Sequence, residues 1–253
     1  MQVGMSAATP HEKYKRLVEK AKTLEPMSVV VAHPCDESSL TGALDAAQLG
    51  LIKPTLVGPK AKIEMIATRL RLDISACVLV DAPHSHAAAA KAVELARAGK
   101  VDALMKGSLH TDELLVEVVN RESGLRTARR ISHCFVMDVP GHPDALIISD
   151  AAVNIAPTLE DKVDIVQNAI DLEAAAVKQI VSPVAGRANV LIAPDIEAGN
   201  MLAKSLAFLA NADSAGIVLG AKVPIILTSR ADSVMARLAS CAVAVFVAQA
   251  QRR

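Results

Sequence analysis

The sequence predicts an α/β protein in which helices cover both faces of a mainly parallel sheet. Short apolar runs alternate with longer amphipathic segments along the 253 residues, and this strand-then-helix order favours parallel pairing. Hydrophobic residues make up 52% of the chain, whereas aromatic residues make up only 2%. The core must therefore consist of Ala, Val, Ile and Leu, which is typical of helices packed on a parallel sheet.

The expected strands are short, rich in β-branched residues or Leu, and bounded by Pro, Gly, Asp or His. They cover residues 28–32, 54–57, 78–80, 103–105, 134–138, 145–149, 190–193, 216–219 and 224–227. The expected helices cover residues 36–49, 60–71, 85–98, 111–119, 159–177, 197–210 and 233–249. Side chains suited to an N-cap stand near four helix starts: Ser85, Thr111, Thr158 with Asp161, and Asp232.

One place breaks the alternation of strands and helices. The strands at 134–138 and 145–149 follow each other across the turn Pro140-Gly141-His142-Pro143, which implies local antiparallel pairing. Such a change often marks the edge of a structural unit. We therefore expect a domain boundary near residue 149.

Composition excludes several classes of protein. Net charge is zero, with 27 basic and 27 acidic residues, so no global field attracts nucleic acid or an anionic membrane. Few rings are available to stack on bases, and no uncharged apolar run is long enough to span a bilayer. The four cysteines form no CxxC pair, so we expect reduced thiols and no metal site. These features predict a cytoplasmic protein without nucleic-acid or membrane partners.

The strongest local signal is the loop at residues 228–233. Ser229, Arg230 and Asp232 follow an expected strand and open the last helix. Ligands of open α/β folds bind at the carboxyl ends of strands, and helix N-termini attract anions. A hydroxyl, a guanidinium and a carboxylate here suit phosphate binding and proton transfer. The alternative is that Ser229 and Asp232 cap the helix while Arg230 forms a salt bridge.

A second loop, at Lys106 and Gly107, also joins a strand to a helix. Lysine and glycine at such a turn suit a phosphate or pyrophosphate, although the spacing is not that of a Walker motif. The alternative is a tight turn with an exposed lysine. Arg126, Arg129 and Arg130 suit the phosphates of a nucleotide-like cofactor, although the last two also fit a solvated charge run.

Further polar residues stand near the ends of expected strands. They are Asp150, Asn154, Asp195, Glu197 and Asn200. Paired carboxylates can bind a divalent metal. For Asp195 and Glu197 we favour turn and N-cap positions instead.

Four blocks of the sequence resemble the phosphate acetyltransferase/phosphate butyryltransferase family. They are residues 105–110 leading into 124–132, then 148–159, 181–205 and 213–233. The resemblance implies two α/β domains of the isocitrate/isopropylmalate dehydrogenase-like kind, an active site in the cleft between them, and usually a homodimer. It also implies that the final helix returns to the first domain. We therefore expect domains at 1–148 plus 228–253 and at 149–227.

The resemblance also implies roles for particular residues. The serine–arginine pair of the family matches Ser229 and Arg230, which would stabilise charge at the thioester carbonyl and bind phosphate. The aspartate that serves as base in the acetyltransferase branch is replaced by Ala236, so Asp232 is our substitute candidate. Arg126 matches a family arginine that contacts substrate or cofactor, and Lys106, Gly107 and Asn200 complete the expected acyl-CoA site.

The implied reaction moves an acetyl or butyryl group between coenzyme A and inorganic phosphate. Coenzyme A is then a substrate, and no tightly bound cofactor, metal or covalent intermediate is required. A dehydrogenase on a similar fold would need a nicotinamide site and a metal cluster, and neither is evident.

In one respect the chain departs from the family. Family members carry several dozen more residues between the helix at 159–169 and the block that starts at 181. Residues 168–175 look like the two borders of that segment joined together, as an in-frame deletion would leave them. The second domain is therefore expected to be shortened. A weakly active or non-catalytic relative that binds coenzyme A remains an alternative hypothesis.

Overall fold

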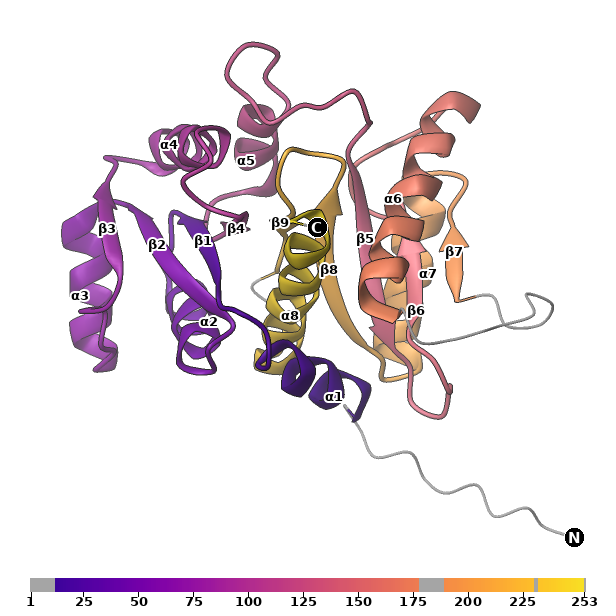
Figure 1. Ribbon diagram of the computed structural model, residues 1–253, viewed down its shortest axis with the longest axis horizontal. Helices are drawn as coiled ribbons and strands as arrows, with labels where there is room; N and C mark the ends of the chain where they lie inside the picture. Colours follow the sequence, from indigo (N-terminus) through magenta and orange to yellow (C-terminus); the bar gives the residue numbers. More distant parts are fainter. Residues whose placement is uncertain (1–11, 178–188, 230–231, 253) are drawn as a thin grey trace, which may run out of the picture.

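The computed structural model describes residues 12–177, 189–229 and 232–252 (Figure 1). Within these ranges nine strands form one sheet, in the order β3-β2-β1-β4-β9-β8-β5-β6-β7. The strands are β1 Met27–Ala32, β2 Ile52–Gly58, β3 Val78–Asp81, β4 Ala103–Lys106, β5 Ser132–Asp138, β6 Leu146–Ser149, β7 Val190–Ile192, β8 Asp213–Leu219 and β9 Ile225–Ile226. The helices are α1 Glu12–Ala21, α2 Glu37–Gln48, α3 Lys60–Leu70, α4 Ser85–Arg97, α5 Thr111–Val118, α6 Leu159–Val177, α7 Ile196–Leu209 and α8 Val234–Gln251.

The α/β class and the mainly parallel sheet are confirmed. Strands β3, β2, β1, β4 and β9 pair parallel with one another in that order. Strand β8 is antiparallel to both β9 and β5, and β5 pairs antiparallel with β6 as the Pro-Gly-His-Pro turn predicts. Strand β7 pairs parallel with β6 at the sheet edge. The proposed division into two domains stays a prediction.

Alternating side chains of the strands face two helical layers. In β1, Val29 and Val31 pack in the cluster that includes α2 and α8, whereas Val30 and Ala32 pack against the alanines of α4. This follows from the two-residue period of a strand that is buried on both faces. Small alanines let the helices approach the sheet closely.

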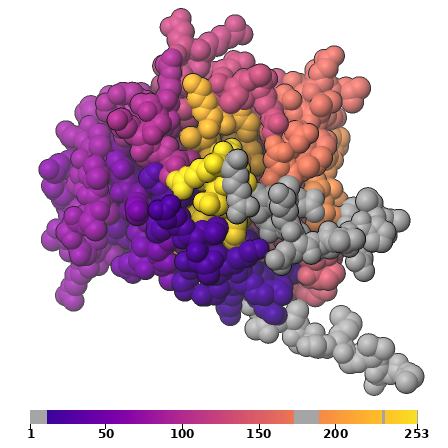
Figure 2. Space-filling view, in the orientation of Figure 1, coloured from indigo at the N-terminus to yellow at the C-terminus, as the bar shows by residue number. Residues whose placement is uncertain are grey.

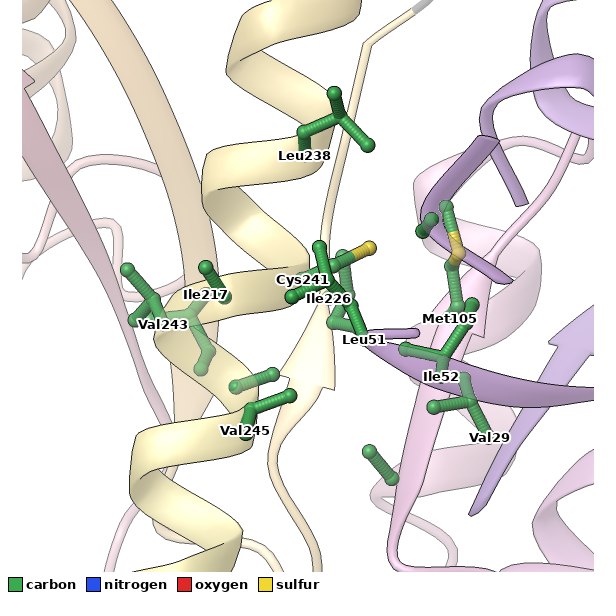
Figure 3. Close-up of a cluster of buried hydrophobic side chains, with 14 of the residues drawn as sticks. Val29, Leu51, Ile52, Met105, Ile217, Ile226, Leu238, Cys241, Val243 and Val245 are labelled. Atoms are coloured by element: carbon green, nitrogen blue, oxygen red, sulfur yellow. The ribbon is translucent and has the colours of Figure 1, made fainter. Parts of the chain in front are cut away.

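Helix α8 forms the centre of the core, between the two ends of the sheet (Figure 1). Leu238, Cys241 and Val245 of α8 lie in one buried cluster with Ile217 of β8 and Ile226 of β9 (Figure 3). Among the described residues α8 is the one helix with the length and hydropathy of a membrane span. Most of it is buried inside the protein, as expected for a core helix.

Helix α1 joins α8 to the antiparallel part of the sheet. Its Tyr14 hydroxyl donates hydrogen bonds to the carbonyl oxygens of Val136 and Asp213. Lys13 pairs with Asp138 at 2.6 Å. In Figure 2 the yellow atoms of α8 lie beside the indigo atoms of the N-terminal part of the chain.

Three of the four expected N-caps are displaced by one residue. Thr158 is confirmed, because its Oγ1 accepts from Asp161 N–H while the Asp161 carboxylate accepts from Thr158 N–H. The other N-caps are His84, His110 and Ser233 in place of Ser85, Thr111 and Asp232. A ring nitrogen of His84 accepts from Ala87 N–H, a capping group that composition rules for N-caps do not include.

Candidate active site

The candidate site lies where β4 and β9 end. These strands are parallel neighbours, with Met105 opposite Ile226, so the residues that follow them leave the sheet at the same edge. Lys106 and Gly107 follow Met105, and Thr228 and Ser229 follow β9 by two or three residues. The two loops singled out in the sequence are therefore adjacent, although more than 100 residues separate them along the chain.

Ser229 and Asp232 are tied to each other and do not cap α8. The N–H of Ser229 donates to Oδ2 of Asp232 at 2.7 Å, and the N–H of Asp232 donates to the carbonyl oxygen of Ser229 at 3.2 Å. The cap is Ser233, whose Oγ accepts from the N–H of Ala236 at 3.1 Å. The alternative in which Ser229 and Asp232 only cap the helix is therefore wrong. Arg230 lies outside the described residues.

The Asp232 carboxyl group is partly buried, and two cations influence its pKa. Burial raises its pKa above the ordinary value of an aspartate. The hydrogen bond from Ser229 N–H and the positive charges of Arg237 and Lys106 act in the opposite direction. A carboxylate with a raised pKa is a better proton acceptor than an exposed aspartate, which suits a general base.

Lys106 is buried, with 8% of its surface exposed, so the alternative of an exposed lysine in a tight turn is wrong. Its Nζ donates to the carbonyl oxygens of Gly107 at 3.2 Å and Leu109 at 3.1 Å. A side chain at Gly107 would overlap the carbonyl oxygens of Ala32 and His33, so the loop needs glycine for a close backbone approach. Gly107 therefore has a structural role, whatever it binds.

Of the three arginines that precede β5, two form ion pairs with carboxylates of helix α6. Arg129 pairs with Asp171, and Arg130 pairs with Asp161 at 2.9 Å. The side chain of Arg126 is exposed and forms no hydrogen bond or ion pair with the described residues. Only Arg126 of the three therefore remains available to a ligand in the described structure.

A polar cluster follows β6 in the other half of the sheet. The Asp150 carboxylate accepts hydrogen bonds from the N–H groups of His133, Ala152, Val153 and Asn154. Asn200 Nδ2 lies 3.4 Å from the carbonyl oxygen of Ala151. No hydrogen bond or ion pair among the described residues links Asn200 or Arg126 to the Ser229–Asp232 loop. Among the described candidates, Asn200 and Arg126 are thus not joined by a hydrogen bond or ion pair to Ser229, Asp232, Lys106 or Gly107.

Two further polar residues of the strand ends lie at the start of α7. Asp195 accepts from Ala198 N–H and is the N-cap of α7, as favoured from the sequence, and Glu197 lies in the first turn. Within the described residues no group of three or more His, Cys, Asp or Glu side chains is arranged to hold a metal ion. At the end of β1, burial raises the pKa of the Cys35 thiol to about 11, so this thiol is protonated at neutral pH.

Sequence reasoning missed Arg237 and His133. Arg237 is a buried cation on α8 that acts on Asp232, and His133 is a buried ring whose pKa burial lowers to about 4. Arg237 is the single charged residue in the otherwise largely apolar segment of α8, and this pattern could have pointed to an unusual environment. No comparable signal marked His133.

Comparison with known proteins identifies the family of this chain. A model of the phosphate acetyl/butaryl transferase family matches residues 85–174 and 167–245. The chain belongs to this family. The phosphate acetyltransferase of Rhizobium meliloti is 52% identical over 299 residues, which cover 95% of each chain. The phosphate butyryltransferase of Clostridium acetobutylicum (strain ATCC 824) is 30% identical over 296 residues, with 94% of this chain and 98% of the relative covered.

Solved structures of the family share the fold. A phosphotransacetylase from Streptococcus pyogenes superimposes with a TM-score of 0.78 at 17% sequence identity, covering 97% of this chain and 100% of the other. At this identity the likeness shows the fold alone.

The matched ranges locate the shortened segment. Residues 167–174 match the family model twice, once at the end of the first range and once at the start of the second. The alignment to the Rhizobium meliloti relative runs over 299 positions, whereas this chain has 253 residues, so several dozen positions have no counterpart here. Both observations fit the joining of two family segments within α6, Leu159–Val177.

Proposed function

We propose that this protein transfers an acetyl or butyryl group between coenzyme A and inorganic phosphate. The observation that carries the proposal is the hydrogen-bonded pair Ser229 and Asp232 beside the buried Lys106, at the carboxyl edge of two parallel strands. In open α/β sheets this edge is where ligands bind. Family membership supports the same chemistry.

Ser229, Arg230 and Asp232 of this loop each have a role in the proposed reaction. A phosphate oxygen attacks the thioester carbonyl, a C–O bond forms, and the C–S bond breaks as the thiolate leaves with its electron pair. The Ser229 hydroxyl donates to the carbonyl oxygen as negative charge develops there. Arg230 binds phosphate through two parallel hydrogen bonds. In the reverse direction Asp232 accepts the thiol proton of coenzyme A.

The remaining candidates would bind the rest of acyl-CoA. Lys106 places a positive charge at the site, and Gly107 keeps the loop backbone close to β1. Arg126 offers an exposed guanidinium to the phosphates of coenzyme A. Asn200 contributes from the other half of the sheet, which fits a cleft between domains at 1–148 plus 228–253 and at 149–227.

The proposal is tested by measuring release of free coenzyme A from acetyl-CoA and from butyryl-CoA with phosphate varied. Saturable, phosphate-dependent release supports acyl transfer, and the ratio of kcat/KM for the two substrates gives the acyl preference. Binding of coenzyme A without release, seen by calorimetry, would support a non-catalytic relative instead. Activity that appears only with NAD and a divalent metal would support a dehydrogenase.

We further propose that the protein is a cytoplasmic homodimer. The four cysteines are free, in keeping with a reducing compartment. Large apolar side chains of α7, including Met201, Phe208 and Leu209, are exposed on the single chain, and such residues often mark an interface. Sedimentation velocity over a range of concentrations distinguishes a dimer from a monomer.

A further inference from the structure

His33 lies at the carboxyl end of β1, beside the loop that carries Lys106 and Gly107. Ala32 of β1 stands opposite Lys106 of β4 in the parallel register. The N–H of Gly107 donates to the carbonyl oxygen of Ala32 at 2.9 Å, and the N–H of Ser108 donates to the carbonyl oxygen of His33 at 2.9 Å. Backbone hydrogen bonds therefore join these two loops at the edge of the sheet that holds the candidate site.

The backbone of His33 lies in the left-handed region, with a φ of 56°. Among the described residues, Arg71 and Asn211 share this conformation without being glycine, and both follow the end of a helix, where it is common. His33 instead follows a strand. A residue with a side chain is uncommon in this region, and such positions cluster at functional sites. A function of the His33 side chain would explain why glycine does not stand here.

Hydrogen bonds to Ser108 assign the tautomer of the His33 ring. The Ser108 hydroxyl donates its proton to the carbonyl oxygen of His33 at 2.8 Å, and its oxygen accepts from the N–H of Cys35 at 3.3 Å. Nδ1 of His33 lies 3.0 Å from the same hydroxyl oxygen. Because the hydroxyl proton is already used, the proton of this third contact belongs to Nδ1. Nε2 of the neutral ring then carries a lone pair.

The His33 ring is half-buried and neutral at neutral pH. Burial lowers the pKa of His33, and the charge of Lys62 and the nearby His84 also lower it, whereas Glu113 and Asp36 act in the opposite direction. Within the part of the chain that the structure describes, Nε2 forms no hydrogen bond or ion pair. The ring therefore offers a hydrogen-bond acceptor at the edge of the candidate site.

We propose that Nε2 of His33 accepts a hydrogen bond from an amide N–H of the pantetheine arm of acyl-CoA. The inference rests on the proposed function, in which the thioester lies at Ser229. Neighbouring strands lie about 4.8 Å apart, so β1 ends about 10 Å from β9, the strand that leads to Ser229. The pantetheine arm runs away from the thioester sulfur over such a distance and carries amide groups. A nitrogen with a lone pair and no proton suits an amide donor and does not suit a phosphate oxygen.

Two substitutions separate the two ring nitrogens. In His33→Asn the side-chain amide reaches about as far as Nδ1 does, so it keeps the contact with Ser108, and asparagine tolerates the left-handed region. Nothing in this variant replaces Nε2. In His33→Gln the amide reaches about as far as Nε2 does, and the contact with Ser108 is lost. We expect the Kd of coenzyme A to rise about 2–10-fold in His33→Asn and to change less in His33→Gln.

Calorimetry with parts of coenzyme A locates the contact. Pantetheine carries the arm without the nucleotide, and its Kd should rise in His33→Asn as much as that of coenzyme A. The adenosine bisphosphate part carries the nucleotide without the arm, and its Kd should stay unchanged. The matched control is His142→Asn, which makes the same substitution in the turn between β5 and β6, four strands away from β1. It should leave every Kd unchanged.

The outcomes separate this inference from the proposed function. If the unaltered protein binds coenzyme A but does not release it from acyl-CoA, the proposed function fails, while the Kd values still test His33. An unchanged Kd for pantetheine in a folded His33→Asn overturns the inference. A greater loss of binding in His33→Gln than in His33→Asn also overturns it, because His33 would then serve only to hold Ser108.

A second measurement applies if His33→Asn does not fold. Nitrogen NMR of the unaltered protein with labelled histidine reports which ring nitrogen carries the proton. We expect Nε2 of His33 to be unprotonated at neutral pH and its resonance to shift when pantetheine is added. A protonated Nε2, or a resonance that does not respond to pantetheine, would overturn the inference.

Discussion

The N–H of Ser229 donates a 2.7 Å hydrogen bond to the carboxylate of Asp232, and the N–H of Asp232 donates back to the Ser229 carbonyl oxygen. The two residues are thus fixed relative to each other before α8 begins. Neither of them caps the helix, since Ser233 does. The proposed catalytic roles and the capping role at this loop therefore fall on different residues, and substitutions can separate them.

We predict that Ser229→Ala lowers kcat by about 10²–10³, or roughly 3–4 kcal/mol, because it removes a donor to the developing oxyanion. The melting temperature should stay close to that of the unaltered protein. Steady-state kinetics and thermal melting on one preparation measure both effects. Retained turnover would exclude the hydroxyl from the reaction.

The matched variant is Ser233→Ala. It removes the side chain that caps α8 and should cost about 1 kcal/mol of stability. Ser233 has no role in the proposed reaction. The turnover of Ser233→Ala should therefore fall far less than the turnover of Ser229→Ala does. A variant with unchanged stability and strongly reduced turnover would reverse these assignments.

Arg230→Lys should weaken the use of phosphate while leaving the fold intact. A lysine keeps the charge but cannot form two parallel hydrogen bonds to one phosphate group. We expect the KM for phosphate to rise more than the KM for acyl-CoA. Kinetics with each substrate varied in turn measure the difference, and an unchanged KM for phosphate would remove Arg230 from the phosphate site.

Asp232→Asn should lower activity by about 10²–10⁴ if this carboxylate is the base. The folded state of the Asp232→Asn variant should be more stable than that of the unaltered protein at neutral pH. Burial raises the pKa of Asp232, so the native state holds the proton more tightly than the unfolded state does. Stability then falls as pH rises through the window between the unfolded and the raised pKa.

The asparagine variant avoids this loss, so it should melt at a higher temperature than the unaltered protein at pH 7. The difference should disappear below about pH 4, the ordinary pKa of an aspartate. Melting curves between pH 3 and 8 decide the point. A lower melting temperature at pH 7 would mean that the ionised carboxylate stabilises the fold.

Insertion of a relative's segment after Ala169 should increase turnover. The strand β7 stands at the sheet edge, and α6 and α7 expose large apolar side chains, among them Val163 and Phe208. Exposed strand edges and apolar faces are features that further elements of a domain normally cover. The measurement is kcat for both forms of the protein. Equal values would show that the family tolerates the compact form.

The fold class was predictable because local pattern determines it. Short apolar runs between amphipathic segments predicted β1 and β4, and the Pro-Gly-His-Pro turn predicted the antiparallel pair β5 and β6. N-caps were less predictable, because histidines at positions 84 and 110 take places that composition rules give to hydroxyl or carboxyl side chains. Element boundaries depend on such single contacts.

Long-range contacts explain what the sequence did not reveal about the site. The burial of Lys106 depends on the adjacency of β4 and β9, which are far apart along the chain. The environment of Arg237 depends on Gly42, in a different helix. Sequence spacing placed Ser229 and Asp232 in one loop, but only the structure shows which of their groups are hydrogen-bonded.

The central claim is tested most directly by ³¹P NMR of the protein with butyryl-CoA or acetyl-CoA and inorganic phosphate. We predict that an acyl phosphate resonance grows in equal amount to the free coenzyme A released, and that Ser229→Ala slows its appearance by about 10²–10³. Release of coenzyme A without acyl phosphate would indicate hydrolysis of the thioester. No release with either substrate would contradict acyl transfer at this site.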